Sequence, residues 1–458
     1  MAAITRKKDT LMTEGAIWKN ILLFALPLML GNIFQQLYNT VDSIVVGNFV
    51  GKEALAAVGT TDSIINTFIG FFSGLATGSG IIISQYFGEK NEKGVHDAVH
   101  TTIALTFLMS LICTACAILL VPAFLHMMGT PKDVFEQSAV YLRIYFAGSM
   151  GLLFYNMGAG ILRAVGDSRR PLYFLIFSAL LNIVLDLFFV AYLGLGVAGV
   201  AWATIISQGA SAILIMAALS RETESYRVIW REVRINPVMT RKIFQIGLPS
   251  ALQMAVTSFS NVFVQSYINH FGSAAMAGWS SYGKIDKFCL LPIQSISMGV
   301  TTFVGQNLGA GKIRRIRQGM KSGLLLAMLT SAVIAAVMLV FGQAILGCFI
   351  TGTPEEAART MEIAYHYLAI MSVCLPILYL LHVVRSSIQG MGDTVLPMLS
   401  GVVEFLMRTG AALFLPLAMG QEGIFYAEIL AWIGADVVLV VSYFVRIKGL
   451  KGGDESGD

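Results

Sequence analysis

The chain has 458 residues, of which 56% are hydrophobic and only 13% are charged, and its formal net charge is +4. Soluble domains carry roughly 25% charged residues, so this composition excludes an ordinary soluble enzyme or binding domain. The five cysteines are scattered and odd in number, which excludes a disulfide framework.

The charged residues occur in clusters, and long apolar runs separate these clusters. A helix of about 20 apolar residues crosses the roughly 30 Å hydrocarbon core of a bilayer. The pattern therefore predicts an all-α integral membrane protein with twelve transmembrane helices. In chain order we expect them at residues 18–45, 53–81, 97–121, 136–158, 162–192, 197–219, 241–269, 275–303, 318–346, 361–384, 388–416 and 423–446.

These spans divide the chain into two halves of six helices each. The linker between the halves is rich in charge, and we expect it to contain a short interfacial helix. The predicted parts are an N-terminal lead at 1–15, an N-terminal lobe at 16–219, the linker at 220–240, a C-terminal lobe at 241–447 and a tail at 448–458.

The distribution of basic residues predicts the orientation. When the loops are assigned alternately to two sides, nearly all loop Lys and Arg residues fall on the side of the N-terminus. Only Lys52, Lys132 and Arg359 fall on the other side. Because basic loops stay in the cytoplasm, we expect both termini to be cytoplasmic.

Motifs of the first half return in the second half. Gly166-Asp167 returns as Gly392-Asp393, and the Leu-Pro pair at residues 26–27 returns at residues 248–249. A duplicated bundle of membrane helices is typical of a secondary transporter. Because each half has an even number of spans, both copies enter the membrane from the same side, and the repeats are parallel.

Two aspartates lie deep inside predicted spans. Asp42 is in the first span and Asp186 is in the fifth. Tyr38 and Asn182 precede them by four residues, on the same helical faces. A charge inside the membrane is costly, so each aspartate needs a partner or a function. Two interpretations follow: each carboxyl group is hydrogen-bonded within the bundle, or the two form a site for H⁺ or Na⁺.

The second half has charged residues inside its own spans. Lys284 and Lys287 share a helical face beside Asp286, either as lysines that extend to the membrane surface or as residues that line a substrate cavity. Glu404 and Arg408 are four residues apart and are expected to neutralise each other. The sequence assigns no role to a further set: Arg143, His382, Arg385, Glu428 and Asp436.

No catalytic motif accompanies these residues. The glycine pairs at residues 194–196 and 309–311 do not follow strands, and Walker motifs for ATP binding are absent. The sequence therefore predicts a transporter that is not an enzyme and that uses no cofactor.

Three segments carry a resemblance to a known family. Residues 35–47, QQLYNTVDSIVVG, resemble the first helix of the multidrug and toxic compound extrusion (MATE) transporters. Residues 163–171, RAVGDSRRP, resemble that family's loop between helices four and five, and residues 196–204, GVAGVAWAT, resemble the start of its sixth helix. The similarity covers nearly the whole chain and is strongest to bacterial members of the DinF and MepA kind. It implies two six-helix lobes in a V shape and cation-coupled export of organic cations.

The resemblance also implies site residues. DinF-like members bind a cation in the N-terminal lobe, and the matching positions for H⁺ or Na⁺ here are Asp42, Asn182, Asp186 and Thr204, with Tyr38 and Asn156 beside them. NorM-like members use a glutamate where this chain has Thr257, which argues against a site of that kind in the C-terminal lobe. The substrate cavity is expected to include Gln35, Lys284, Asp286 and Lys287.

The sequence thus predicts a secondary antiporter that exports amphipathic, often cationic compounds by alternating access, driven by inward H⁺ or Na⁺. A flippase for lipid-linked precursors is the alternative. We expect a monomer in the bacterial inner membrane whose partners are small organic substrates and membrane lipids, and we expect no binding to nucleic acid.

Overall fold

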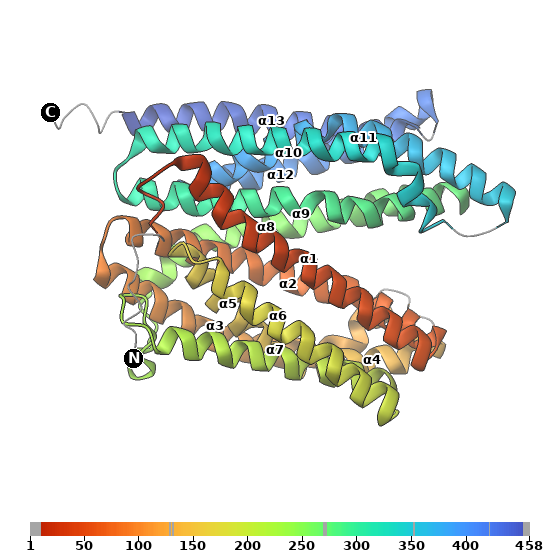
Figure 1. Cartoon of the computed structure of the whole chain (residues 1–458), viewed down its shortest axis with the longest axis horizontal. Helices are drawn as coiled ribbons and strands as arrows, with labels where there is room; N and C mark the ends of the chain where they lie inside the picture. The colour runs from red at the N-terminus through yellow and green to blue at the C-terminus, as the bar shows by residue number, and fades with distance from the viewer. Residues whose placement is uncertain are drawn as a thin grey trace. The chain divides into compact units, whose positions relative to one another are not determined.

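The computed structural model describes residues 11–127, 130, 132–268, 273–350, 353–420 and 422–451. Within these ranges all regular secondary structure is helical (Figure 1), which confirms the all-α prediction. The α-helices are α1 (Ile17–Phe49), α2 (Lys52–Gly88), α3 (Glu92–Met127), α4 (Lys132–Ala147), α5 (Ser149–Ala164), α6 (Arg169–Asp186), α7 (Gly196–Ser220), α8 (Pro237–Ile268), α9 (Ser273–Gly309), α10 (Ile313–Gly347), α11 (Pro354–Gly390), α12 (Val395–Met419) and α13 (Glu422–Lys451). A π-helix, Leu187–Tyr192, follows α6.

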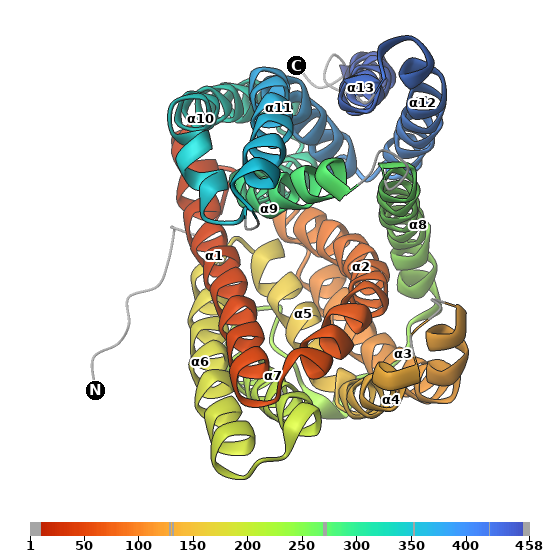
Figure 2. The ribbon, with the colours of Figure 1, turned by 90° about the vertical axis from the view of Figure 1, so that its right-hand side faces the viewer.

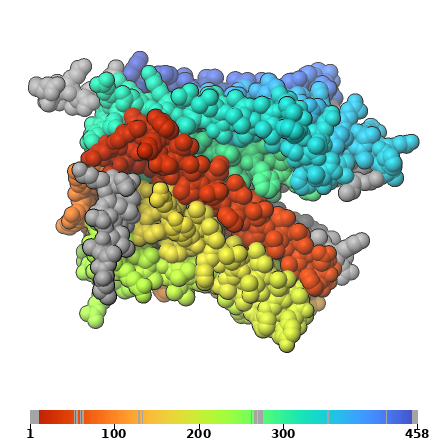
Figure 3. Space-filling model, in the orientation of Figure 1, coloured from red at the N-terminus to blue at the C-terminus, as the bar shows by residue number. Residues whose placement is uncertain are grey.

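The helices have the length and the surface of membrane spans. In the described residues, ten helices are long and apolar enough to cross a bilayer. On α10, Leu325, Leu329, Val333 and Val340 are exposed along the helix, and this helix lies at the surface in Figure 3. Such a stripe is unfavourable in water and favourable against lipid chains.

Three predicted spans differ in detail from the observed helices. The span predicted at 136–158 consists of two helices, α4 and α5, which are separated at Gly148. The spans predicted at 162–192 and 388–416 begin too early, because a turn separates α5 from α6 and another separates α11 from α12. Both turns contain small and polar residues that favour turns over helix, Gly166-Asp167-Ser168 in the first and Gly392-Asp393-Thr394 in the second.

The prediction of a helix in the linker is wrong. Before α8 begins, the linker contains only a short 3₁₀ turn, Trp230–Glu232. Its backbone is held instead by side chains of α3: Ile229 N–H donates to Nε2 of His100 at 3.0 Å, and Asn236 N–H donates to Oγ1 of Thr101 at 3.4 Å. These tertiary hydrogen bonds satisfy amides that a helix would otherwise use.

The chain packs as two compact units. The first unit is Leu30–Ala251, and the second combines Met12–Met29 with the chain from Leu252 onward. Helices α1 and α8 each contribute residues to both units, so the units do not coincide with the lobes predicted at 16–219 and 241–447.

In the first unit, α5 is central and packs against α2, α3, α6 and α7 (Figure 2). Small residues allow α2 to approach the beginning of α8 closely. A Cβ added at Gly74 would lie 2.4 Å from the backbone of Ala251, and one added at Gly78 would lie 2.5 Å from the backbone nitrogen of Gly247. Glycine is therefore required for this contact, as is common between membrane helices.

We expect Gly74→Ala to destabilise the protein by about 1–3 kcal/mol, because the new methyl group overlaps a backbone that cannot move independently. Gly70→Ala is the matched control, since Gly70 lies one turn earlier on α2 and a Cβ there would have no neighbour within 4 Å. The control should keep or raise stability, by up to about 1 kcal/mol. Thermal unfolding in detergent measures both, and equal melting temperatures would contradict the described packing.

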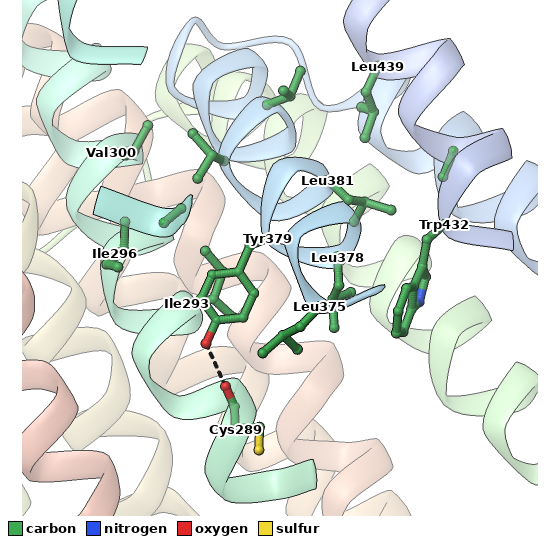
Figure 4. Packing of buried hydrophobic residues seen from close by; sticks show 14 of the residues in the cluster. Cys289, Ile293, Ile296, Val300, Leu375, Leu378, Tyr379, Leu381, Trp432 and Leu439 are labelled. Carbon is green, nitrogen blue, oxygen red and sulfur yellow. Dashed lines mark hydrogen bonds between the residues drawn. The ribbon is translucent and has the colours of Figure 1, made fainter. Parts of the chain in front are cut away.

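In the second unit, α11 is central and packs against α9, α10 and α13. Its apolar side chains form one large buried cluster with those of the neighbouring helices (Figure 4). Tyr379 is fully buried in this cluster, and its hydroxyl donates a hydrogen bond of 2.7 Å to the carbonyl of Cys289 on α9. The buried hydroxyl is thereby satisfied, which fixes how α11 lies against α9.

The sequence repeat is preserved in the backbone. Gly166 and Gly392 have φ angles of 90° and 85°, a conformation that favours glycine. In the first copy the amide of Asp167 donates to the carbonyl of Leu162 at 2.9 Å, and in the second Asp393 donates to Ile388 at 3.3 Å. Equivalent helices, α5 and α11, thus end in the same turn, which supports two parallel repeats.

Candidate cation-binding site

Helices α1 and α6 bring the two predicted aspartates together. The carboxyl groups of Asp42 and Asp186 lie close enough for each to affect the charge of the other. Tyr38, one turn before Asp42, lies close enough to interact with both carboxyl groups. Helix α1 meets side chains of α6 at Gly31, where an added Cβ would lie 3.3 Å from Cδ2 of Leu175.

Asp186 is buried and Asp42 is half-buried, and most of their carboxyl oxygens accept no hydrogen bond from the described residues. Asp186 is 0% exposed and Asn182 is 2% exposed. Among the described residues, no group donates a hydrogen bond to either carboxyl oxygen of Asp186 or to Oδ1 of Asp42, and the Asn182 amide has no partner either. Two carboxyl groups in contact can form a hydrogen bond only by sharing a proton. A proton or a cation held between the two carboxyl groups would satisfy these oxygens.

The helix geometry places Asp186 at a break in α6. Asp186 is the last residue of α6, and the π-helix Leu187–Tyr192 follows it directly. Short π segments occur frequently at functional sites, because the extra residue per turn redirects side chains. Asn182 and Asp186 are one turn apart, so both face the same side of α6.

Thr204 and Asn156 belong to the same unit. Thr204 is 5% exposed near the start of α7, the helix that packs along α6 and the π-helix. Its hydroxyl donates to the carbonyl of Val200 at 2.9 Å, which leaves the oxygen able to accept or to ligate. Asn156, on α5, donates its amide to the carbonyl of Leu152 at 3.0 Å.

The arrangement has the chemistry of a small-cation site. Its polar atoms are carboxylate, amide and hydroxyl oxygens, which are the ligands that hard cations prefer. Neither aspartate forms an ion pair with a basic residue in the described parts of the chain. Because like charges in a low-dielectric site repel, one bound H⁺ or Na⁺ would stabilise such a pair.

The four residues expected in the substrate cavity have other surroundings. Gln35 is exposed on α1, and Lys284 and Lys287 are exposed on α9. The Lys284 ammonium lies 5.4 Å from the centre of the Phe349 ring. Asp286 accepts a hydrogen bond of 2.8 Å from the hydroxyl of Tyr282. Their role in substrate binding stays a prediction.

A second buried polar group, in the second unit, was only partly predicted. The expected pair is present: Arg408 contacts Glu404 at 2.9 Å. Arg408 also contacts Glu428 at 2.9 Å, and Arg385 contacts Glu404 at 3.0 Å, so the ion pairs connect α11, α12 and α13. The spacing of four residues predicts the pair within α12. The contacts between different helices cannot be predicted in this way, because the sequence shows only that each residue is a charge in an apolar run.

Comparisons with known proteins agree with this fold. The MatE family profile matches residues 27–188 and 249–412. The probable multidrug resistance protein YoeA of Bacillus subtilis (strain 168) is 30% identical over 374 residues, which are 80% of this chain and 79% of that protein. The multidrug export protein MepA of Staphylococcus haemolyticus is 22% identical, over 85% of this chain and 86% of that protein.

A solved structure of a MOP superfamily transporter from Pyrococcus furiosus has the same fold. It matches with a TM-score of 0.91 and 24% sequence identity, over 98% of this chain and 99% of that one. The family profile covers both repeats, including the helices that carry Asp42 and Asp186. With its membrane helices and its duplicated bundle, the chain belongs to the MatE family, whose members are membrane transporters and not enzymes.

Proposed function

We propose that this protein exports small organic compounds, often amphipathic or cationic, in exchange for H⁺ or Na⁺. The observation that carries the proposal is the proximity of Asp42 to the buried Asp186. Both carboxyl oxygens of Asp186 and Oδ1 of Asp42 accept no hydrogen bond from the described residues. The relatives YoeA and MepA are named for multidrug resistance and multidrug export, which supports the same class of substrate.

The cation and the substrate would be exchanged by alternating access. In parallel-repeat transporters, one repeat moves against the other, and the site opens to one side at a time. Binding of the cation to Asp42 and Asp186 would favour a conformation with low affinity for the substrate, which is then released. By reciprocity, substrate binding would weaken cation binding by the same factor. We place the protein in the bacterial inner membrane, with both termini in the cytoplasm.

The proposal is tested with purified protein in liposomes loaded with ethidium, a fluorescent organic cation. One set of vesicles receives an imposed pH gradient, a second receives a Na⁺ gradient, and a third receives neither. We expect a gradient to accelerate ethidium movement through the protein, and the gradient that does so identifies the coupling ion. Equal rates in all three sets would contradict coupled transport.

A further inference from the structure

Another buried aspartate lies in the second unit, on α13. Asp436 is 7% exposed, and both of its carboxyl oxygens are buried without a hydrogen-bond partner among the described residues. Trp432 and Leu439, one turn before it and one turn after it, belong to the apolar cluster that faces α11 (Figure 4). Asp436 thus occupies a position in an apolar stripe, where a carboxyl group is not expected.

The charged groups around Asp436 are already engaged. Arg385, on α11, bonds to Glu404 at 3.0 Å and reaches Oγ of Ser400 at 3.4 Å. Arg385 and Glu404 are close enough to Asp436 to affect its charge, yet neither forms an ion pair or hydrogen bond with it in the described structure. His382, on the same helix as Arg385, faces the same two groups.

The charge balance leaves a carboxyl group without a counterion. Arg408, the other guanidinium, is shared between Glu404 and Glu428 at 2.9 Å each. Asp286, on α9, also lies near Arg408 and is held by Tyr282. In this cluster the carboxyl groups therefore outnumber the guanidinium groups, even before Asp436 is included.

An isolated carboxylate is too costly to keep charged in such a place, so it takes up a counter-charge. A metal ion is disfavoured, because hard cations require several oxygen ligands, whereas the neighbouring carboxylate, Glu404, is already paired with two guanidinium groups. A proton requires no ligand shell.

We propose that Asp436 is a proton-binding site of the second unit, separate from the Asp42–Asp186 pair. With the proton bound, Arg385 stays with Glu404 on α12. When the proton leaves, Arg385 has two competing carboxylates, one on α12 and one on α13, and the ion-pair network rearranges. The inference concerns the charge of one side chain, so its test does not depend on the proposed export function.

Infrared spectroscopy tests the proposal, because a protonated carboxylic acid has a carbonyl band that a carboxylate lacks. The purified protein is titrated between about pH 5 and pH 9. This range includes neutral pH and lies above the ordinary aspartate pKa of about 3.9. We expect a protonated-acid band at neutral pH that is lost in Asp436→Asn. Asp393→Asn is the matched control, since Asp393 caps the turn before α12 and accepts from the Leu396 amide at 3.3 Å; this variant should retain the band.

Asp436→Glu provides a second measurement that does not depend on the folding of the asparagine variant. It keeps an acid at this position, so the band should change its position and not disappear. Spectra of the wild type, Asp436→Asn and Asp436→Glu with the same protonated-acid bands at every pH would overturn the proposal.

Discussion

Asp186→Asn is expected to reduce gradient-driven export to the rate of protein-free vesicles while the protein stays folded and still binds substrate. Asparagine keeps the shape of the side chain, but it cannot gain or lose a proton, and its amide nitrogen can donate directly to Asp42. Asp186 is 0% exposed, and neither of its carboxyl oxygens accepts a hydrogen bond in the described structure. Asp42→Asn should have the same effect, since the two carboxyl groups act as a pair.

Asp97→Asn is a suitable control for this experiment. Asp97 is a partly buried aspartate of α3, with one carboxyl oxygen 3.6 Å from Nδ1 of His96, and it lies far along the sequence from the pair. Export by this variant should match the wild type. If Asp186→Asn and Asp42→Asn both export at the normal rate under an imposed gradient, the coupling site lies elsewhere in the protein.

Arg408→Met is expected to have the largest effect on stability. Its guanidinium bonds to both Glu404 and Glu428, and it is 3% exposed. Removing one member of a buried ion pair leaves an uncompensated charge and destabilises a protein by about 3–5 kcal/mol. We therefore expect a large fall in the melting temperature in detergent, or no folded protein at all.

Two further variants separate charge balance from packing. Arg446→Met removes an exposed arginine of α13 and should change the free energy of unfolding by no more than about 0.5 kcal/mol. Arg408→Met combined with Glu428→Gln leaves Glu404 paired with Arg385, so much of the lost stability should return. An Arg408→Met protein as stable as Arg446→Met would show that the ion pairs are not required.

The sequence predicted the features that depend on local composition. Long apolar runs predicted the membrane helices, and the recurring glycine and aspartate at 166–167 and 392–393 predicted an internal repeat. In the structure both glycines have positive φ angles in equivalent turns. The helix starts near these turns were expected too early, because the predicted spans included the turn residues Gly166-Asp167-Ser168 and Gly392-Asp393-Thr394. The linker helix was wrong because His100 and Thr101, on a distant helix, accept the linker's amide hydrogens.

The two polar clusters also differ in how far the sequence predicts them. Asp42 and Asp186 each stand out as a charge in an apolar run, and the family resemblance suggested that they meet. The contacts of Arg385 with Glu404 and of Arg408 with Glu428 depend on how α11, α12 and α13 pack. No spacing within one helix encodes such contacts, so only the folded chain reveals the network around Asp436.

The exchange itself is measured most directly by reversing it. Liposomes containing the protein and an internal pH or Na⁺ indicator receive an ethidium gradient as the only driving force. Because coupling between two ligands is reciprocal, the moving substrate should drive H⁺ or Na⁺ in the opposite direction, and Asp186→Asn should abolish this flux. Movement of ethidium without a counterflow of either cation, or counterflow that persists in Asp186→Asn, would contradict the account.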